Sequence, residues 1–378
     1  MDAGGHNMRD TKAEIHLKNL EHNVKALSQN VQDNTLFCGV VKADGYGHGA
    51  VYIADHLQKN GVNHLAVAIA EEALELRKAN ITTPLLVLTP VEADYLKDLI
   101  TNQVKLTVFT EKQAEAIKQV AEDIETTAIV HLKVDSGMSR IGVKDSFEAV
   151  QVLRAMDSKF VNVEGIYTHF ADADNMEDDS FTHQQFDIFK TIMDDLEAKH
   201  HTFKIRHCCN TAATVRYPEY HLDMVRVGIG LYGYLPDESM KGLADLKPVM
   251  TVKSKIAHLK SIQPGRKVGY GCTFEALENT SIATVVMGYA DGVLRTLSNK
   301  GHFVLHDTKV PIVGRICMDQ LMLDVSRVPD AKVNDEVIWF GYEVDEINSL
   351  FEVCKVSGGF HYEILTRISQ RIPRVYIR

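Results

Sequence analysis

The sequence predicts an α/β protein, with an N-terminal (α/β)8 TIM-type barrel followed by a C-terminal mainly-β domain. From residue 36 to 232, apolar runs alternate with amphipathic helical stretches, as in βαβ units around a parallel sheet. Eight such runs occur, which is the number of strands in a closed barrel. After Asp237, short strand-like runs separated by proline and glycine replace this alternation, which indicates a second domain.

Each barrel strand is expected where a short apolar run stands between helical patterns. The eight runs are 36–41, 64–69, 84–88, 105–109, 128–134, 163–168, 204–208 and 224–229. Helical patterns such as 71–78 and 184–199 lie between them. An amphipathic segment at 15–27 precedes the first run, and we expect it to cap the barrel.

The second domain is expected to be built mainly from strands. Its strand-like runs are 249–262, 281–287, 302–305, 309–313, 320–325 and 336–340, with one helix near 346–354. A chain of 378 residues also favours two domains over one. We therefore expect a disordered lead-in at 1–10, the barrel at 11–244 and the β domain at 245–378.

Composition excludes several classes of function. A net charge of −10 without any basic run argues against a nucleic-acid surface. No apolar stretch approaches the roughly 20 residues of a membrane helix, and the polar start lacks a signal-peptide core, so we expect a cytoplasmic protein. The six cysteines form no Cys-x-x-Cys pair and the 17 histidines show no metal-ligand spacing, so no metal is expected.

Lys42 is the strongest candidate for chemistry because it follows an apolar run and precedes a glycine-rich turn. Burial at the mouth of a strand lowers the pKa of a lysine and leaves a nucleophilic amine. Such an amine can form a Schiff base with a carbonyl cofactor. The alternative is a lysine that simply extends from the strand end into solvent.

Other polar residues occupy equivalent places in the predicted barrel. Lys133 lies on the fifth strand, His169 follows the sixth and Thr211 follows the seventh. The carboxyl ends of the strands of a parallel barrel meet on one face, where the active sites of such barrels lie. These side chains are therefore expected to converge with Lys42.

Eight segments in order give the chain a family resemblance. They are 40–50 (VVKADGYGHGA), 135–142, 168–171, 207–212, 226–233, 269–271, 287–292 and 313–319. Together they resemble the alanine racemases, which are fold-type III pyridoxal-phosphate enzymes. The resemblance implies interconversion of L- and D-alanine, a supply of D-alanine for peptidoglycan, and a homodimer with active sites at the subunit interface.

The resemblance also implies the residues that hold pyridoxal 5'-phosphate. Arg226 contacts the pyridine nitrogen, His169 lies beside the ring and His207 holds Arg226 in place. A permanently charged arginine cannot give the ring a proton, which leaves the cofactor a weaker electron sink. The attachment and phosphate residues implied are Lys42, Tyr46, Thr211, Gly228, Ile229 and Tyr362. Residues 228–233 also match the dinucleotide pattern G-x-G-x-x-G, but no helix is predicted to begin there.

Racemisation requires acid–base groups on both faces of the substrate Cα. By resemblance these groups are Lys42 and Tyr270, with Tyr270 supplied by the partner subunit. Arg140 and the amide of Met318 would bind the substrate carboxylate, and Tyr289 and Asp319 would have supporting roles. Lys133 matches a position that can be carbamylated to give an anion that fixes Arg140; the alternative is a lysine paired with an acid.

Two other functions remain open at this point. A broad-specificity racemase acting on serine, lysine or arginine would share the same motifs, because pocket volume is not readable from sequence. A non-catalytic pyridoxal-phosphate-binding protein consisting of the barrel alone would lack Tyr270 and the more than one hundred residues after the barrel. A decarboxylase on the same scaffold would be expected to carry a carboxylate in place of Arg226.

Overall fold

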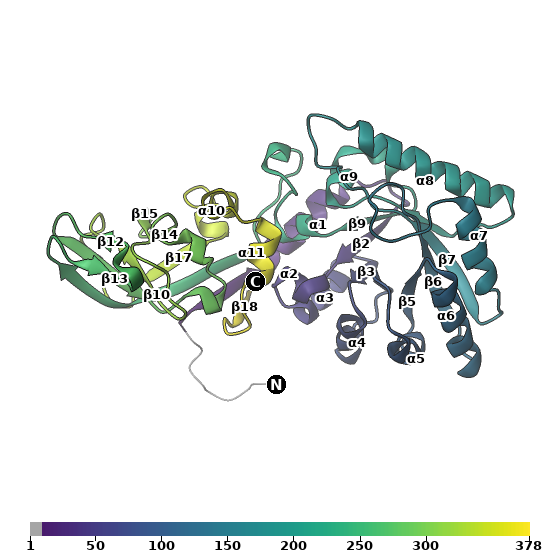
Figure 1. Ribbon diagram of the computed structural model, residues 1–378, viewed down its shortest axis with the longest axis horizontal. Helices are drawn as coiled ribbons and strands as arrows, with labels where there is room; N and C mark the ends of the chain where they lie inside the picture. Colours follow the sequence, from purple (N-terminus) through teal and green to yellow (C-terminus); the bar gives the residue numbers. More distant parts are fainter. Residues whose placement is uncertain (1–9) are drawn as a thin grey trace. The chain divides into compact units, whose positions relative to one another are not determined.

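The computed structural model describes residues 10–378 and divides into two compact units (Figure 1). One unit, called here the barrel unit, comprises 21–45 and 49–246. The other, the β unit, comprises the described residues up to Leu20, the short segment Tyr46–His48, and Lys247–Arg378. Residues 1–9 of the expected lead-in lie outside the described part of the chain. Among residues 10–378, no helix combines the length and the hydropathy needed to cross a bilayer.

The barrel unit contains the eight predicted parallel strands, in the order β8-β7-β6-β5-β4-β3-β2-β9. The strands are β2 (Leu36–Val40), β3 (His64–Val67), β4 (Leu85–Val87), β5 (Val104–Val108), β6 (Ala128–Lys133), β7 (Val161–Tyr167), β8 (Ile205–His207) and β9 (Met224–Val227). β8 and β9 are joined by two backbone hydrogen bonds, Asp223 N to Arg206 O and Arg226 N to Cys209 O, both 3.0 Å. The sheet is thereby nearly closed, as the fold class requires.

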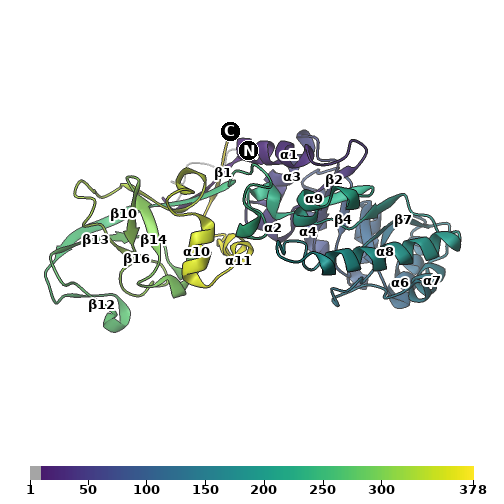
Figure 2. The ribbon, with the colours of Figure 1, turned by 90° about the horizontal axis from the view of Figure 1, so that it is seen from above.

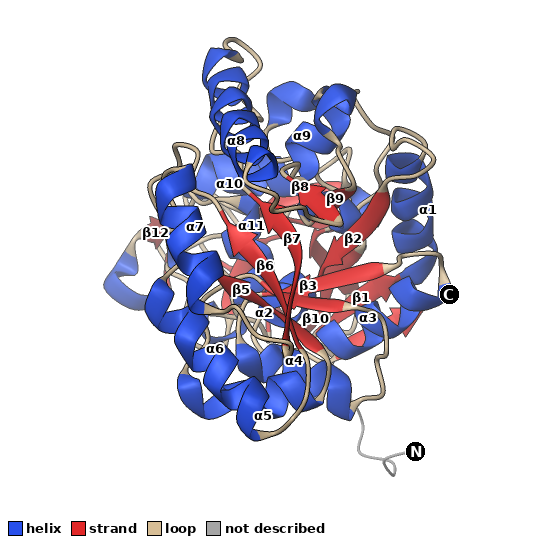
Figure 3. Cartoon of the chain, turned by 90° about the vertical axis from the view of Figure 1, so that its right-hand side faces the viewer, coloured by secondary structure: helices blue, strands red, loops and turns tan. Residues whose placement is uncertain are grey.

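Helices surround these strands, as Figure 3 shows in blue around red. They are α1 (Leu17–Ser28), α3 (Ala50–Lys59), α4 (Ala70–Lys78), α5 (Ala93–Thr101), α6 (Glu111–Asp123), α7 (Ser146–Ala155), α8 (Ser180–Ala198) and α9 (Thr211–Arg216). α6 illustrates their local cause. Thr110 caps it by accepting from the backbone N–H of Gln113, whose side chain accepts in return from Thr110 N. Its buried Ala114, Ile117 and Ala121 recur at helical spacing.

The β unit is organised around the long strand β10, which pairs with β1, β13 and β17. Figure 2 shows β10, β13, β14 and β16 with the helices α10 and α11. The elements are β1 (Lys12–His16), β10 (Met250–Ile262), β11 (Lys267–Val268), β12 (Phe274–Glu275), β13 (Thr280–Val285), β14 (His302–Leu305), β15 (Thr308–Pro311), β16 (Leu321–Asp324), β17 (Glu336–Phe340), β18 (Arg374–Ile377), α10 (Leu350–Ser357) and α11 (His361–Arg367). The rings of Trp339, Phe303 and Phe340 are fully buried and pack together in its core.

The first strand differs from the expectation that 11–244 would form the barrel. β1 pairs antiparallel with β10 and parallel with β18, so it belongs to the β unit. The physical reason is that β1 lies between β10 and β18, so that Ala13, Glu14 and Ile15 are all buried. The strand has only five residues, and the helix α1 begins directly after them. In the sequence, the helical pattern of the residues that follow therefore hides this short strand.

Candidate active site

Lys42 is followed by a left-handed turn, the segment α2 (Lys42–Tyr46). Ala43, Asp44 and Tyr46 have φ of 52°, 54° and 53°. For residues with a side chain this conformation costs about 1–2 kcal/mol each. The turn is held by Gly45 N donating to Val41 O at 2.9 Å and by the Asp44 carboxylate, which accepts from the N–H of the first residue of α3 at 2.8 Å. Strain of this kind persists where the surrounding structure fixes a functional group.

Glu72 ties this turn to the end of the neighbouring strand. One of its carboxylate oxygens accepts from Ala43 N at 2.6 Å, and the other accepts from Ala68 N at 2.8 Å. Glu72 was not predicted as a site residue. Its place in the first turn of α4 signals a helix cap, but only the fold brings it to residue 43.

The Lys42 amine is available for reaction. Its side chain has no hydrogen bond or ion pair with any residue in the range 10–378. Burial, together with the charges of Arg140 and Arg226, lowers the pKa of Lys42 and outweighs the opposing charge of Glu72. A larger fraction of the amine is therefore neutral and nucleophilic than in an ordinary lysine.

Arg226 is buried on β9 and its guanidinium is held on two sides. Nη1 donates to Nδ1 of His207 at 2.7 Å. Nη2 donates to Thr168 O, Cys208 O and Nδ1 of His169 at 2.9, 3.1 and 3.2 Å. Because arginine only donates, both Nδ1 atoms must accept, which makes both imidazoles neutral. Burial and the Arg226 charge correspondingly lower the pKa of His169 and of His207 well below the usual value. The Arg226 Nε–H has no acceptor among residues 10–378.

Thr211 and the chain after β9 form a set of donors. The Thr211 hydroxyl accepts from Gly228 N at 3.0 Å and from Gly230 N at 3.4 Å. Ile229 N has no acceptor in the described part of the chain. A Cβ on Gly230 would lie 2.8 Å from Cγ2 of Thr211, so glycine is needed for this close approach. The Thr211 O–H and the Ile229 N–H are left to donate from this group, and such donors can hold a phosphate.

Lys133 ends β6 in a nearly dry environment, with 4% of its surface exposed. Burial and the charge of Arg226 lower the pKa of Lys133 to about 7. Its Nζ donates to Val134 O at 2.5 Å and lies 5.3 Å from the centre of the Tyr167 ring. No carboxylate in the range 10–378 forms an ion pair with it, so the alternative of a lysine paired with an acid is not what this structure contains.

Arg140 lies on an exposed turn beside this cluster. The turn is shaped by Asp135, whose carboxylate accepts from Gly137 N and Ser139 N at 3.0 Å. Within the described residues the Arg140 guanidinium has no hydrogen bond or ion pair. The charges of Arg226, Arg140, Lys133 and Lys42 all contribute to lowering the pKa of His169, so each of these four cations lies close enough to act on that imidazole. Of the side chains expected to converge with Lys42, Lys133 and His169 are linked to it through these electrostatic effects, whereas Thr211 contacts the chain after β9.

The remaining predicted residues belong to the β unit. The buried ring of Tyr46 lies 6.0 Å, centre to centre, from the ring of Tyr362. Tyr270 is on an exposed turn, with 71% of its surface accessible. Met318 is also exposed, and its carbonyl accepts from the N–H of Ala290, directly after Tyr289.

Asp319, next to Met318, accepts from Arg371 at 2.7 Å. The β unit thus brings Tyr289 near Met318 and Asp319 and, separately, pairs Tyr46 with Tyr362. It presents Tyr270 to solvent.

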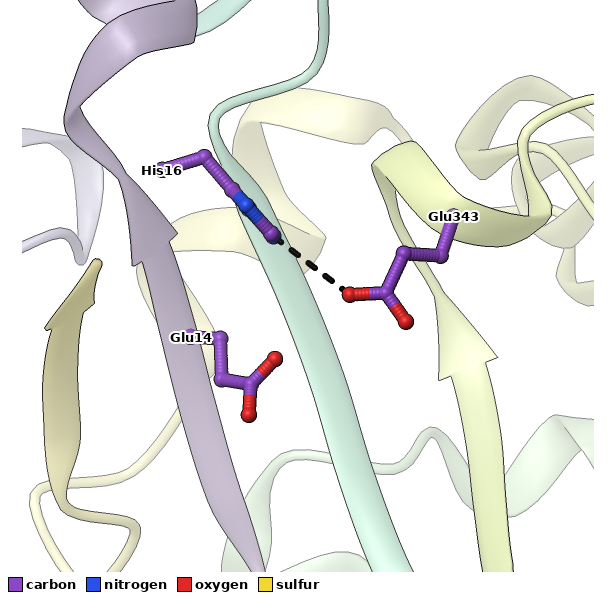
Figure 4. A group of neighbouring side chains, drawn as sticks. All are labelled: Glu14, His16 and Glu343. Atoms are coloured by element: carbon purple, nitrogen blue, oxygen red, sulfur yellow. Dashed lines mark ion pairs between the residues drawn. The ribbon is translucent and has the colours of Figure 1, made fainter. Parts of the chain in front are cut away.

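One group of metal-ligand type lies elsewhere in the β unit and was not predicted. Figure 4 shows that Glu14 and His16 from β1 face Glu343, with an ion-pair contact of 3.9 Å between His16 and Glu343. The ammonium of Lys253 already lies between the two carboxylates, 2.8 Å from Glu14 and 2.7 Å from Glu343. A lysine supplies the positive charge here, so this cluster is a partly buried ion-pair network.

Comparison with known proteins places both units in one family. Residues 15–236 match the family model "Alanine racemase, N-terminal domain", and residues 249–376 match "Alanine racemase, C-terminal domain". Alanine racemase 2 of Oceanobacillus iheyensis is 46% identical over 370 residues, which are 98% of this chain and 94% of that protein.

Solved structures agree with these matches. The alanine racemase of Clostridium difficile 630 superposes with a TM-score of 0.95 at 37% identity, covering 98% of this chain and 97% of that one. An alanine racemase from Bacillus anthracis with bound L-Ala-P gives 0.93 at 34% identity, with 99% and 96% covered. These likenesses extend over both units, and they show that the chain belongs to the alanine racemase family.

Proposed function

We propose that this chain racemises alanine with the help of pyridoxal 5'-phosphate, using Lys42 and Tyr270 as acid–base groups on opposite faces of Cα. One observation carries the proposal. The amine of Lys42 is uncommitted, has a lowered pKa, and shares the mouth of the barrel with Arg226, Arg140 and Lys133. An amine in this state can capture a carbonyl group, and the surrounding cations suit a phosphate and a carboxylate.

The residues present fit this cofactor. Thr211, Gly228 and Ile229 would hold its phosphate, and the free Nε–H of Arg226 would serve the pyridine nitrogen. His169 would lie beside the ring, and Tyr46 and Tyr362 would add phenol hydroxyls to the phosphate site. When bound, the cofactor withdraws electrons from Cα of the amino acid and so acidifies its proton. Arg226 keeps this withdrawal moderate because it holds its own proton.

Substrate binding falls to Arg140 and to the N–H of Met318. The planar guanidinium of Arg140 can bind a carboxylate through two hydrogen bonds and has no other partner within 10–378. We propose that Lys133 becomes carbamylated and that the resulting anion orients Arg140. Support comes from the pKa of Lys133 near 7 and from the absence of an acid paired with it in the described structure.

Lys42 and Tyr270 would divide the proton transfers between them. Lys42 would take or give the proton on one face, and the Tyr270 phenol would do so on the other. The exposure of Tyr270 in the β unit supports its delivery to a partner subunit, and Met318, Tyr289 and Asp319 would accompany it. We therefore propose a homodimer whose active sites each combine two chains.

The cellular role follows as part of the same proposal. We propose that the enzyme works in the cytoplasm, where it supplies D-alanine for peptidoglycan. All six cysteines are free thiols, which suits a reducing compartment.

A racemisation assay with L-alanine, L-serine, L-lysine and L-arginine tests the function directly. We expect the largest kcat/KM with alanine and conversion from both enantiomers. Comparable values for all four amino acids would instead indicate a broad-specificity racemase. Binding of the cofactor without any racemisation would indicate a non-catalytic binding protein.

A further inference from the structure

A continuous series of hydrogen bonds leads from Arg226 through the interior of the barrel. Nε2 of His207 lies 2.9 Å from Nδ1 of His131, and Nε2 of His131 lies 3.1 Å from the carboxylate of Glu164. Glu164 is paired with the ammonium of Lys105, which lies 3.3 Å from Nε2 of His64. We call these residues the buried series: Arg226, His207, His131, Glu164, Lys105 and His64. They stand on β9, β8, β6, β7, β5 and β3.

Each hydrogen bond in the buried series has only one possible direction. Arg226 must donate to Nδ1 of His207, so His207 carries its proton on Nε2 and donates to Nδ1 of His131. His131 then carries its proton on Nε2 and donates to the Glu164 carboxylate. The Arg226 guanidinium and the Glu164 carboxylate therefore fix the tautomer of the two imidazoles that lie between them.

Burial keeps water away from the two imidazoles, so they must find their hydrogen-bond partners within the protein. His131 and His207 are fully buried, and the ring of Tyr167 stacks on His207 at 4.7 Å and 3°. Burial alone would raise the pKa of Glu164, but hydrogen bonds from His131 and Lys105 outweigh it and lower the pKa to about 2. Glu164 therefore stays an anion, and a buried polar series with every member satisfied holds its geometry.

The backbone is shaped to admit the series. Between β6 and β7 the register passes from Val130 opposite Val163 to His131 opposite Gly165, which leaves Glu164 as an extra residue in a β-bulge. Bulges re-aim a side chain. A Cβ on Gly165 would lie 2.6 Å from Nδ1 of His131, so glycine provides the space for this imidazole. The bulge at Glu164 and the glycine at 165 thus both favour the contact between His131 and Glu164.

We propose that Glu164, Lys105 and His131 are positioning residues for the reaction, which act by keeping His207 an Nε2–H tautomer whose Nδ1 accepts from Arg226. This proposal rests on the proposed function, in which Arg226 serves the cofactor. Two imidazoles separate the Glu164 carboxylate from Arg226, so Glu164 can orient the guanidinium without becoming its acidic partner. Arg226 alone would also accept a flipped His207 ring that offers Nε2, whereas the contact of Nε2 with His131 prevents this flip.

The first test reads the tautomers in the holoenzyme by ¹⁵N NMR after labelling with ¹⁵N-histidine, with His207→Gln and His131→Gln for assignment. We expect both imidazoles to be neutral with the proton on Nε2. In Glu164→Gln we expect the His131 and His207 signals to shift. An Nδ1–H tautomer or an imidazolium at either residue in the unaltered protein would overturn the proposal.

The second test separates positioning from structure by kinetics. Glu164→Gln should lower kcat for alanine by about 10-fold or more, the order found when the hydrogen-bond partner of a metal-bound histidine is removed, while KM changes less than kcat. Because this variant leaves Lys105 buried without its acid, the double variant Glu164→Gln/Lys105→Met removes that unpaired charge. Gly165→Ala should act in the same direction by displacing His131.

Asp194→Asn is the matched control, since Asp194 forms an exposed ion pair with Lys190 in α8. We expect its kcat and histidine signals to equal those of the unaltered protein. Unchanged kcat and unchanged tautomers in both Glu164 variants would refute the proposal. An unaltered enzyme without racemase activity would refute the proposed function instead, while the tautomer measurement would still decide whether the buried series fixes His207.

Discussion

Lys133 offers a sharp prediction because its pKa of about 7 makes a normally charged amine reactive. At pH 8 about nine-tenths of this side chain would be neutral, compared with about 0.3% for a lysine of ordinary pKa. The neutral amine can attack carbon dioxide, forming an N–C bond and releasing one proton, which leaves a carbamate anion. As the pH falls from 8 to 6, the neutral fraction falls to about one-tenth, so the carbamate should be lost over this range.

¹³C NMR of the holoenzyme equilibrated with ¹³C-bicarbonate measures this modification. At pH 8 we expect a carbamate resonance whose intensity corresponds to about one carbamate per chain. This resonance should be absent in Lys133→Met. Lys59→Met is the control, because Lys59 is exposed and paired with Asp55, and it should keep the resonance. Lys133→Met should also raise KM for alanine by about 10-fold, as expected if Arg140 loses one charge-assisted hydrogen bond. A resonance that survives in Lys133→Met, or that is missing from the unaltered enzyme, would refute this reasoning.

Three further substitutions test the cofactor residues. Lys42→Ala should abolish the visible absorbance of the lysine-linked cofactor, and a surviving band would place the attachment elsewhere. Arg226→Glu should increase pyruvate formation per racemisation event, measured with lactate dehydrogenase, because a carboxylate strengthens electron withdrawal by the ring; an unchanged ratio would contradict the role of Arg226. Thr211→Val should weaken binding of pyridoxal 5'-phosphate by about 10-fold but leave binding of phosphate-free pyridoxal unaltered, and equal losses for both would argue against a phosphate contact.

The eight barrel strands could be predicted because each is short, apolar and buried between helices. The run 36–41 corresponds to Leu36–Val40, and 128–134 corresponds to Ala128–Lys133. Prediction was weaker where burial is partial. β7 begins at Val161 rather than at 163, because its first residues are half-exposed and a bulge interrupts the apolar pattern at Glu164.

Long-range pairing was beyond the sequence. β1 and β18 lie far apart in the sequence and pair with each other, and no local pattern identifies either strand. α11 was also missed, since its seven residues carry too short a period to distinguish from a loop.

In the candidate site too, local motifs could be predicted and contacts made by the fold could not. The residues in contiguous motifs, such as Lys42 and Arg226, were found. Glu72 and Glu164 were missed, because a helix cap and a strand residue acquire their roles only when the barrel brings them to the turn after Lys42 and to His131.

The central claim is that a lysine and a tyrosine act on opposite faces of the same carbon. Exchange of the Cα hydrogen with deuterated solvent, measured separately from L- and from D-alanine in Tyr270→Phe, tests it most directly, with Tyr342→Phe as a control for loss of an exposed phenol. The account predicts that exchange from one enantiomer falls by at least about 100-fold while exchange from the other is largely kept. An equal loss from both enantiomers would contradict it.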